Sequence, residues 1–330
     1  MTFDTAFTRR FGLRVPVVQA PMAGVAGPEL VAAAANAGAL GILPIWAVPA
    51  AEAVALIRRT RALTSRPFAV NVRADLAQHE HVAAALAEGI ELINLFWADP
   101  TPTVEALQPR RFELIATVWD ADSARRALAA GAVALIAQGV EAGGHVRGTV
   151  PLATLLPEVC TLAGDVPVAA AGGLAEAADV AAVLALGAGA AVLGTRFVAT
   201  AEADAHDAYK HALVDAGDGS TVLSTCFDGL WPDAPHRTLA NSTWRAWEAA
   251  GRPAAGARPG EVDVVLRDAD GTEYPRYSAM LPTREMTGAI EAAALYAGTG
   301  VGRIRRVPTV ADVVDELTAA LSDPAAAGAD

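Results

Sequence analysis

Short runs of apolar residues recur through the first two thirds of the chain, and alanine-rich stretches with helical spacing separate them. Each run is continuous rather than alternating, which is typical of parallel strands that are buried on both faces of a sheet. Eight strand–helix units within roughly 200 residues approach the size of a TIM barrel, an α/β fold with eight parallel strands. The predicted strands span residues 15–20, 39–44, 68–72, 91–96, 114–118, 132–137, 166–170 and 190–193.

A doubly wound open sheet is the competing α/β fold, and it would carry a G-x-G-x-x-G fingerprint directly after its first strand. The first turn of this chain reads Pro-Met-Ala-Gly-Val-Ala-Gly over residues 21–27 and lacks that spacing. The sequence therefore favours the barrel.

The alternation of strands and helices ends after Phe197. Two apolar runs, 262–266 and 273–277, flank an Asp-Ala-Asp-Gly turn and are expected to form a hairpin. An amphipathic helix over residues 310–321 would return to the barrel wall. We therefore expect a TIM barrel over residues 1–219, an inserted and mainly helical cap over 220–306, and a closing helix with a tail over 307–330.

Composition and charge narrow the classes of function. Hydrophobic residues make up 53% of the 330-residue chain and charged residues 19%, which supports a large buried core. The formal net charge of −12 argues against nucleic acid or an anionic membrane as a partner, because both would repel an acidic protein. Cys160 and Cys226 cannot form a disulfide framework, and no Cys/His group has metal-ligand spacing, so we expect no metal site. The first 14 residues lack the apolar core of a signal peptide, and we expect a cytoplasmic protein.

Three predicted strands end in segments that contain glycine: Ala-Gln-Gly-Val-Glu-Ala-Gly-Gly-His at 137–145, Ala-Ala-Ala-Gly-Gly at 169–173, and Val-Leu-Gly-Thr-Arg-Phe at 192–197. The last two would follow strands 7 and 8, the usual phosphate position of TIM barrels. The pairs Gly172–Gly173 and Gly194–Thr195 would let backbone N–H groups face an anion without obstruction by side chains. Such a pair can instead relieve crowding at the barrel rim, but two pairs after consecutive late strands favour a phosphate site.

Polar residues at strand ends are the candidates for contact with a ligand. His145 follows a glycine pair, and its imidazole can act as a base when neutral and stabilise an anion when charged. Asn71 and Gln138 lie near the ends of apolar strands, where a buried amide needs partners. Ligand heteroatoms would supply those partners, and a backbone bond within the barrel is the alternative. The histidines without a flanking glycine pair, at positions 79, 81, 206, 211 and 236, receive no role.

These segments, together with Gln-Ala-Pro-Met-Ala-Gly at 19–24, resemble the nitronate monooxygenase family, formerly called 2-nitropropane dioxygenases, over most of the chain. The resemblance implies a flavin mononucleotide (FMN) cofactor whose phosphate is held by Gly172, Gly173, Gly194 and Thr195. It also implies that His145 lies over the flavin and acts as the base or as the nitronate-binding residue. The remaining residues expected around FMN are Ala20, Pro21, Met22, Gly24, Asn71, Gln138, Gly143, Gly144 and Gly298.

One segment departs from the family pattern. Gly298 belongs to Tyr-Ala-Gly-Thr-Gly-Val-Gly at 296–302, and relatives often carry glutamine where this chain has Thr299. A hydroxyl can replace only one of the two functions of an amide, so the polar contact expected at Thr299 stays open.

The resemblance implies FMN-dependent oxidation of alkyl nitronates with O2 to a carbonyl compound and nitrite, and of neutral nitroalkanes where His145 removes a proton. The alternative keeps FMN but uses NAD(P)H to reduce quinones or enoyl thioesters, although the chain shows no fingerprint of a pyridine-nucleotide site. A non-redox phosphate-binding barrel is a third reading. Lys210 is the only lysine and follows the eighth strand, which argues against a Schiff-base aldolase. We expect a monomer or homodimer that takes a small-molecule substrate and O2.

Overall fold

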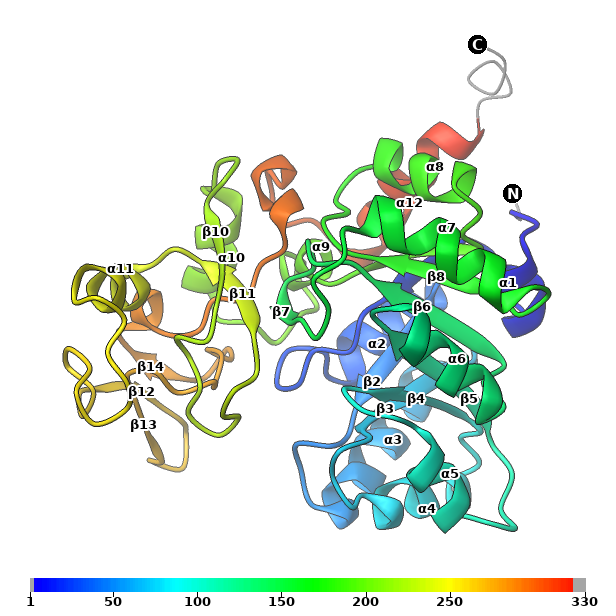
Figure 1. Cartoon of the computed structure of the whole chain (residues 1–330), viewed down its shortest axis with the longest axis horizontal. Coiled ribbons are helices and arrows are strands. Elements are labelled where there is room, and N and C mark those ends of the chain that lie inside the picture. The colour runs from blue at the N-terminus through cyan, green and yellow to red at the C-terminus, as the bar shows by residue number, and fades with distance from the viewer. Residues whose placement is uncertain (1–2, 323–330) are drawn as a thin grey trace.

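The computed structural model describes residues 3–322 and contains a closed barrel of eight parallel strands (Figure 1). Every predicted strand is present, with bounds that differ by no more than two residues from those expected. The barrel strands are β1 (Val17–Gln19), β2 (Leu40–Pro44), β3 (Phe68–Arg73), β4 (Leu92–Phe96), β5 (Glu113–Val118), β6 (Ala134–Gln138), β8 (Val168–Ala171) and β9 (Ala190–Leu193). The predicted TIM barrel is confirmed.

Helices surround the barrel and alternate with its strands (Figure 1). The predicted closing helix is present as α12 (Val310–Thr318), which begins at a capping box between Thr309 and Asp312 and packs against α2 and α8. A 3₁₀ turn, η3 (Ala319–Ser322), extends it. The other barrel helices are α2 (Pro28–Asn36), α3 (Ala50–Leu63), α4 (His79–Ala87), α5 (Thr101–Ala106), α6 (Ala121–Ala129), α7 (Leu152–Ala163), α8 (Ala177–Ala185) and the short α9 (Thr195–Val198).

Small side chains on several barrel strands leave space that is filled by the helix preceding β1. Ala134, Ala169 and Ala190 belong to a buried cluster that also contains Phe7 and Phe11 of helix α1 (Ala6–Phe11). Phe7 is fully buried, and its ring centroid lies 4.8 Å from that of Phe11 in an edge-to-face arrangement. The short helix before β1 therefore supplies bulk that the alanines of β6, β8 and β9 lack.

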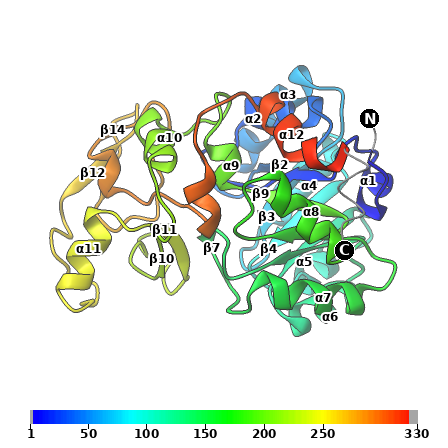
Figure 2. The same ribbon diagram turned by 90° about the horizontal axis from the view of Figure 1, so that it is seen from above.

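The cap is not mainly helical, which corrects the expectation from the sequence. Its one α-helix among the described residues is α11 (Ser242–Ala249), accompanied by the 3₁₀ turns η1 (Ile290–Ala292) and η2 (Thr299–Arg303). Helix α10 (Asp207–Val214) leads into the cap, which lies to one side of the barrel (Figure 2). The two small sheets consist of β10 (Thr221–Ser224), β11 (His236–Leu239) and β7 (Gly144–His145), and of β13 (Glu273–Pro275), β12 (Val264–Arg267) and β14 (Thr287–Gly288).

Strand pairing over long sequence distances explains the correction. The hairpin predicted around residues 268–271 is confirmed by the antiparallel pair β12–β13. In contrast, β11 pairs with β7, which belongs to the loop after β6. A local sequence pattern does not indicate a pairing partner so far away in the chain. The residues of the predicted tail from 323 onward lie outside the described part. The expected domain boundaries at residues 219 and 306 stay a proposal.

No helix within residues 3–322 is both long enough and apolar enough to cross a membrane.

Glycines allow the cap to approach the barrel loops at backbone distance. A Cβ atom on Gly143 would lie 2.5 Å from the amide nitrogen of Gly298, and one on Gly300 would overlap the carbonyl of Gly173. These contacts join two segments that follow barrel strands to the 296–302 segment of the cap. Glycine is therefore required at this junction for packing between chain segments, in addition to any role toward a ligand.

We predict that Gly300→Ala destabilises the protein by about 1–3 kcal/mol, because the added methyl group overpacks a junction that is formed by backbone atoms. Gly217→Ala is the matched control, because its new Cβ would meet only the Ser220 hydroxyl at an ordinary 3.9 Å. Thermal unfolding of both variants measures the effect. Equal melting temperatures for the two variants would contradict the close packing described for Gly300.

Candidate active site

A cavity of about 720 Å³ lies where the barrel strands end and the cap covers them. Such a volume is typical of small-molecule and cofactor sites. The residues that line it include His145 and all thirteen residues expected around FMN. The structure therefore brings the predicted site residues together, while their individual roles stay predictions. Thr299 is not among the lining residues; its N–H donates to the carbonyl of Glu141, 3.0 Å away.

The loops after β8 and β9 present unused backbone donors to the cavity. Gly172 and Gly173 have φ angles of +134° and +69°, a region of conformation that side chains disfavour. Within residues 3–322, no hydrogen bond uses the N–H groups of Gly173, Gly194 or Thr195. The Thr195 hydroxyl accepts the N–H of Gly298 at 3.0 Å and so links this loop to the cap. Converging free N–H groups of this kind suit an anion such as a phosphate.

An arginine from the cap side holds the Gly172–Gly173 loop in place. Nη2 of Arg303 donates to the carbonyl of Gly173 at 2.9 Å and to the Asp179 carboxylate at 2.7 Å. The same carboxylate accepts the N–H groups of Ala175 and Glu176 at 2.7 and 3.0 Å. The carbonyl of Gly173 is thus engaged by Arg303, whereas its N–H group has no hydrogen bond among the described residues.

His145 lies on β7, and aromatic rings of the cap and of the loop after β4 surround its imidazole. The ring stacks on Trp231 with centroids 3.9 Å apart, and Tyr296 and Trp97 lie 5.6 and 5.8 Å away. Its Nε2 atom is buried and has no hydrogen-bond partner within the described residues. Burial, the nearby His236 and the positive charge of Arg73 lower the pKa of His145 to about 3. The imidazole is therefore neutral at physiological pH, and the charged form considered from the sequence is absent there.

Arg73, at the end of β3, supplies the positive charge that His145 lacks, and sequence reasoning missed it. Its side chain is 8% exposed, and it lines the cavity. Asp75 accepts two hydrogen bonds from it, at 3.0 and 2.6 Å. The guanidinium carbon lies 3.3 Å from the ring centroid of Trp231, so one indole ring contacts both Arg73 and His145. A lone arginine at a strand end carries no local signal comparable to a glycine pair.

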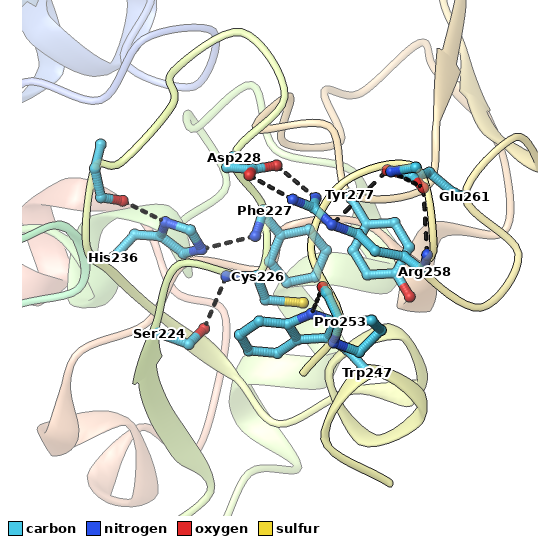
Figure 3. A network of polar contacts seen from close by, with 12 residues as sticks. Ser224, Cys226, Phe227, Asp228, His236, Trp247, Pro253, Arg258, Glu261 and Tyr277 are labelled. Atoms are coloured by element: carbon cyan, nitrogen blue, oxygen red, sulfur yellow. Dashed lines mark hydrogen bonds and ion pairs between the residues drawn. The ribbon is translucent and has the colours of Figure 1, made fainter. Parts of the chain in front are cut away.

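His236 is a second residue that sequence reasoning missed. It pairs directly with His145 in the β7–β11 ladder, and the two ring centroids lie 5.5 Å apart. Its Nε2 accepts the N–H of Phe227 at 3.0 Å, and its Nδ1–H donates to the carbonyl of Ala234 at 2.9 Å (Figure 3). Both ring nitrogens are thereby satisfied, and burial lowers the pKa of His236. This neutral histidine ties together the loop that carries Trp231.

An ion pair within the cap holds the same loop. Two oxygens of Asp228 accept hydrogen bonds from Arg258, both at 2.6 Å, in the bidentate arrangement shown in Figure 3. The indole N–H of Trp247 donates to the carbonyl of Pro253 at 2.9 Å in the same region. Trp247 belongs to the cap core rather than to the cavity, whereas Trp231 and Tyr296 line the cavity. Among the cap tryptophans Trp231, Trp244 and Trp247, Trp231 alone lines the cavity.

The two amides at strand ends have different surroundings. Asn71 donates to the side chain of Asn94 on the next strand at 2.8 Å, which is a bond within the barrel wall, and it also lines the cavity. Gln138 donates weakly to the carbonyl of His145 at 3.3 Å, while its buried Oε1 atom has no partner in the described part of the chain. A buried acceptor without a donor is available to a ligand group, as expected from the sequence for this amide. Glu141 accepts the N–H of Leu152 at 3.0 Å and so fixes its loop.

Comparison with known proteins identifies the family. The model of a family described as nitronate monooxygenase matches residues 5–98 and 77–320. The chain belongs to the nitronate monooxygenase family. It is accordingly an oxidoreductase, and the family predicted from the sequence motifs is confirmed. A nitronate monooxygenase of Paraburkholderia phytofirmans is 35% identical over 70% of this chain and 75% of its own length.

Two further proteins resemble the chain over nearly its whole length. A nitroalkane oxidase structure from Streptomyces ansochromogenes superposes with a TM-score of 0.78 and 31% identity, and covers 98% of this chain and 100% of its own. A protein of Rhodococcus jostii is 33% identical over 96% of each chain. It is named (3aS,4S,5R,7aS)-5-hydroxy-7a-methyl-1-oxo-octahydro-1H-indene-4-carboxyl-CoA dehydrogenase.

We predict that acid destabilises the protein partly through His145. An unfolded histidine binds a proton near pH 6.5, whereas folded His145 has a pKa of about 3, so the unfolded state holds more protons between these values. Stability from this residue is therefore complete above pH 6.5 and is lost as the pH falls below it. His145→Gln should lose less melting temperature than the wild type between pH 7.5 and pH 5. If the melting temperatures of the two proteins fall by the same amount between pH 7.5 and pH 5, His145 is not neutral and desolvated in the folded protein.

Proposed function

We propose that the protein catalyses FMN-dependent oxidation of alkyl nitronates with O2 to a carbonyl compound and nitrite. One observation carries this proposal. The buried guanidinium of Arg73 and the neutral imidazole of His145 line the same cavity as the loops whose backbone N–H groups are unused. A permanent cation in a site of low polarity suits a small resonance-stabilised anion.

The residues present fit FMN. Gly173, Gly194 and Thr195 offer free N–H groups for its phosphate, and Gln138 offers an unpaired acceptor for a ring N–H group. The alanines and glycines of the loops after β1, β8 and β9 leave room for a planar ring. When bound, FMN would take up electrons from the substrate and pass them to O2.

The side chains would divide the remaining tasks. Arg73 would hold the negative oxygens of the nitronate, with Asp75 fixing the direction of its guanidinium. His145 would orient the substrate through Nε2 and would accept a proton from neutral nitroalkanes. A base with a pKa of about 3 removes such a proton poorly, so we expect the preformed nitronate to be the better substrate. Trp231, which covers Arg73, would keep water from the charge.

An anaerobic absorbance titration of the FMN-loaded protein tests the proposal. Propyl-2-nitronate alone should reduce the flavin, and admission of O2 should then release nitrite.

Arg73→Gln should raise the KM for nitronate about 10- to 100-fold, since it removes hydrogen bonds to a charged group, and Arg73→Lys should recover part of the loss. Arg147→Gln is the control, because Arg147 lies exposed over Trp97 and Trp119 outside the cavity lining.

His145→Ala should leave the flavin bound and should depress turnover of neutral nitroalkane far more than turnover of nitronate. Equal loss with both substrates would remove the role of His145 as a proton acceptor. Flavin bleaching by NADH or NADPH, with no response to nitronate, would replace the proposal with the reductase alternative.

A second candidate is oxidation of a carboxyl-CoA thioester. The observation in its favour is that the Rhodococcus carboxyl-CoA dehydrogenase aligns over 96% of both chains, whereas the Paraburkholderia nitronate monooxygenase aligns over 70% of this one. The same anaerobic titration separates the two, because flavin reduction by an alicyclic carboxyl-CoA in the absence of nitronate would favour the thioester. We retain a monomeric or homodimeric, cytoplasmic enzyme as part of the proposal.

We predict that Arg303→Gln weakens FMN binding at least tenfold, because the carbonyl of Gly173 and the Asp179 carboxylate lose the group that fixes the phosphate loop. Arg305→Gln is the control, since Arg305 is exposed and makes no hydrogen bond or ion pair among residues 3–322. Fluorescence titration of the apoprotein with FMN gives both affinities. Equal affinities for the two variants would show that Arg303 does not position the loop.

A further inference from the structure

The methionines of the chain are concentrated at one place. The sequence contains four, and the three within residues 3–322, namely Met22, Met280 and Met286, all line the cavity. Met22 belongs to the loop after β1, and the other two lie on the cap segment 279–286. Leu281 of that segment and Tyr274 of β13 line the same cavity. None of these cap residues lies on the loops that carry the expected phosphate contacts.

The segment 279–286, which we term the roof, is anchored along its length. At one end, the Tyr296 hydroxyl donates to the carbonyl of Ala279 at 2.9 Å. Further along, the N–H of His206 donates to the carbonyl of Pro282 at 3.1 Å, and the N–H of Arg284 donates to the carbonyl of Asp204 at 2.9 Å. The roof is therefore held by backbone bonds and not only by its side chains.

The anchor of the roof continues into the barrel. The N–H of Asp204 donates to the carbonyl of Val25 at 3.0 Å, in the loop after β1. The Leu281 side chain lies 3.7 Å and the Thr283 methyl group 3.4 Å from the position of a Cβ on Gly24. Roof and loop thus meet at Gly24, with Met22 close by in the sequence.

Few charged side chains line the cavity, and none of them lies on the roof. Arg73 and Glu52 are the charged side chains among the described residues that line it, and Glu52 lies on helix α3 rather than on the roof. The roof contributes thioether and branched alkyl side chains. Methionine is unbranched and polarisable, so a fixed backbone that carries methionines adapts to apolar groups of different outline.

We propose that the substrate carries a bulky apolar group, branched or alicyclic, next to its acidic carbon, and that Met280 and Met286 enclose this group beneath the roof. The acidic end of the substrate then faces Arg73 and His145. This placement rests on the function proposed above, whereas the enclosure of the apolar group does not. Small substrates of two or three carbons leave the methionine side chains without contact and forgo the stabilisation of apolar burial.

Binding of an unreactive probe tests the inference independently of turnover. Decahydronaphthalene-2-carboxylate, titrated into the FMN-loaded wild type and followed by flavin absorbance or tryptophan fluorescence, should bind at least tenfold more tightly than propionate. Met280→Ala with Met286→Ala should remove most of that difference, and Met280→Leu should retain it. Leu223→Ala is the control, since Leu223 is 39% exposed on the cap and lies outside this cavity. Melting temperatures establish that each variant is folded.

Turnover then separates failure of this inference from failure of the proposed function. The nitronate of nitrocyclohexane should exceed ethyl nitronate in kcat/KM at least tenfold, and the Met280→Ala, Met286→Ala variant should reduce this ratio. Oxidation of both nitronates with equal kcat/KM, and equal binding of both carboxylates, would overturn the inference and leave the proposed function standing. Tight, methionine-dependent binding of the alicyclic carboxylate without oxidation of any nitronate would support the inference and overturn the proposed function.

Discussion

The whole site depends on backbone contact between the loop after β6 and the cap. The pairing of β7 with β11 places His145 opposite His236, and the close approach of Gly143 to Gly298 brings the 296–302 segment onto the barrel rim. Without this junction the barrel would end in open loops, and neither Trp231 nor Tyr296 would face the cavity. Catalytic sites of TIM barrels lie at this end of the strands, and here the cap closes it.

Closure determines the electrostatics of the site. Arg73 is buried between Asp75 and the indole of Trp231, so its charge is held in place and little screened by water. The same burial keeps His145 neutral, with His236 and Arg73 lowering its pKa further. A fixed cation beside a neutral imidazole suits an anion that arrives already charged. The methionine roof adds an adaptable apolar side to this polar end.

Local patterns in the sequence were sufficient for the barrel and for much of the site. Continuous apolar runs identified all eight strands, because a strand that is buried on both faces has few polar positions. Gly172–Gly173 and Gly194–Thr195 were recognisable because glycines after consecutive strands of a barrel meet at one rim. The cap was predicted wrongly as mainly helical, since β11 pairs with β7 about ninety residues earlier and its short run carries no sign of that partner.

The sequence by itself determined which strands form the barrel, which loops carry glycine and that His145 stands at a strand end, because each depends on neighbouring residues. Only the tertiary structure decided that His145 is neutral, that Arg73 supplies the charge and that Trp231 covers both. It also showed that Gly143 and Gly298 pack closely against each other in addition to lining the cavity. Burial and charge at a point are sums over groups distant in the chain, and they exist only once the cap has folded onto the barrel.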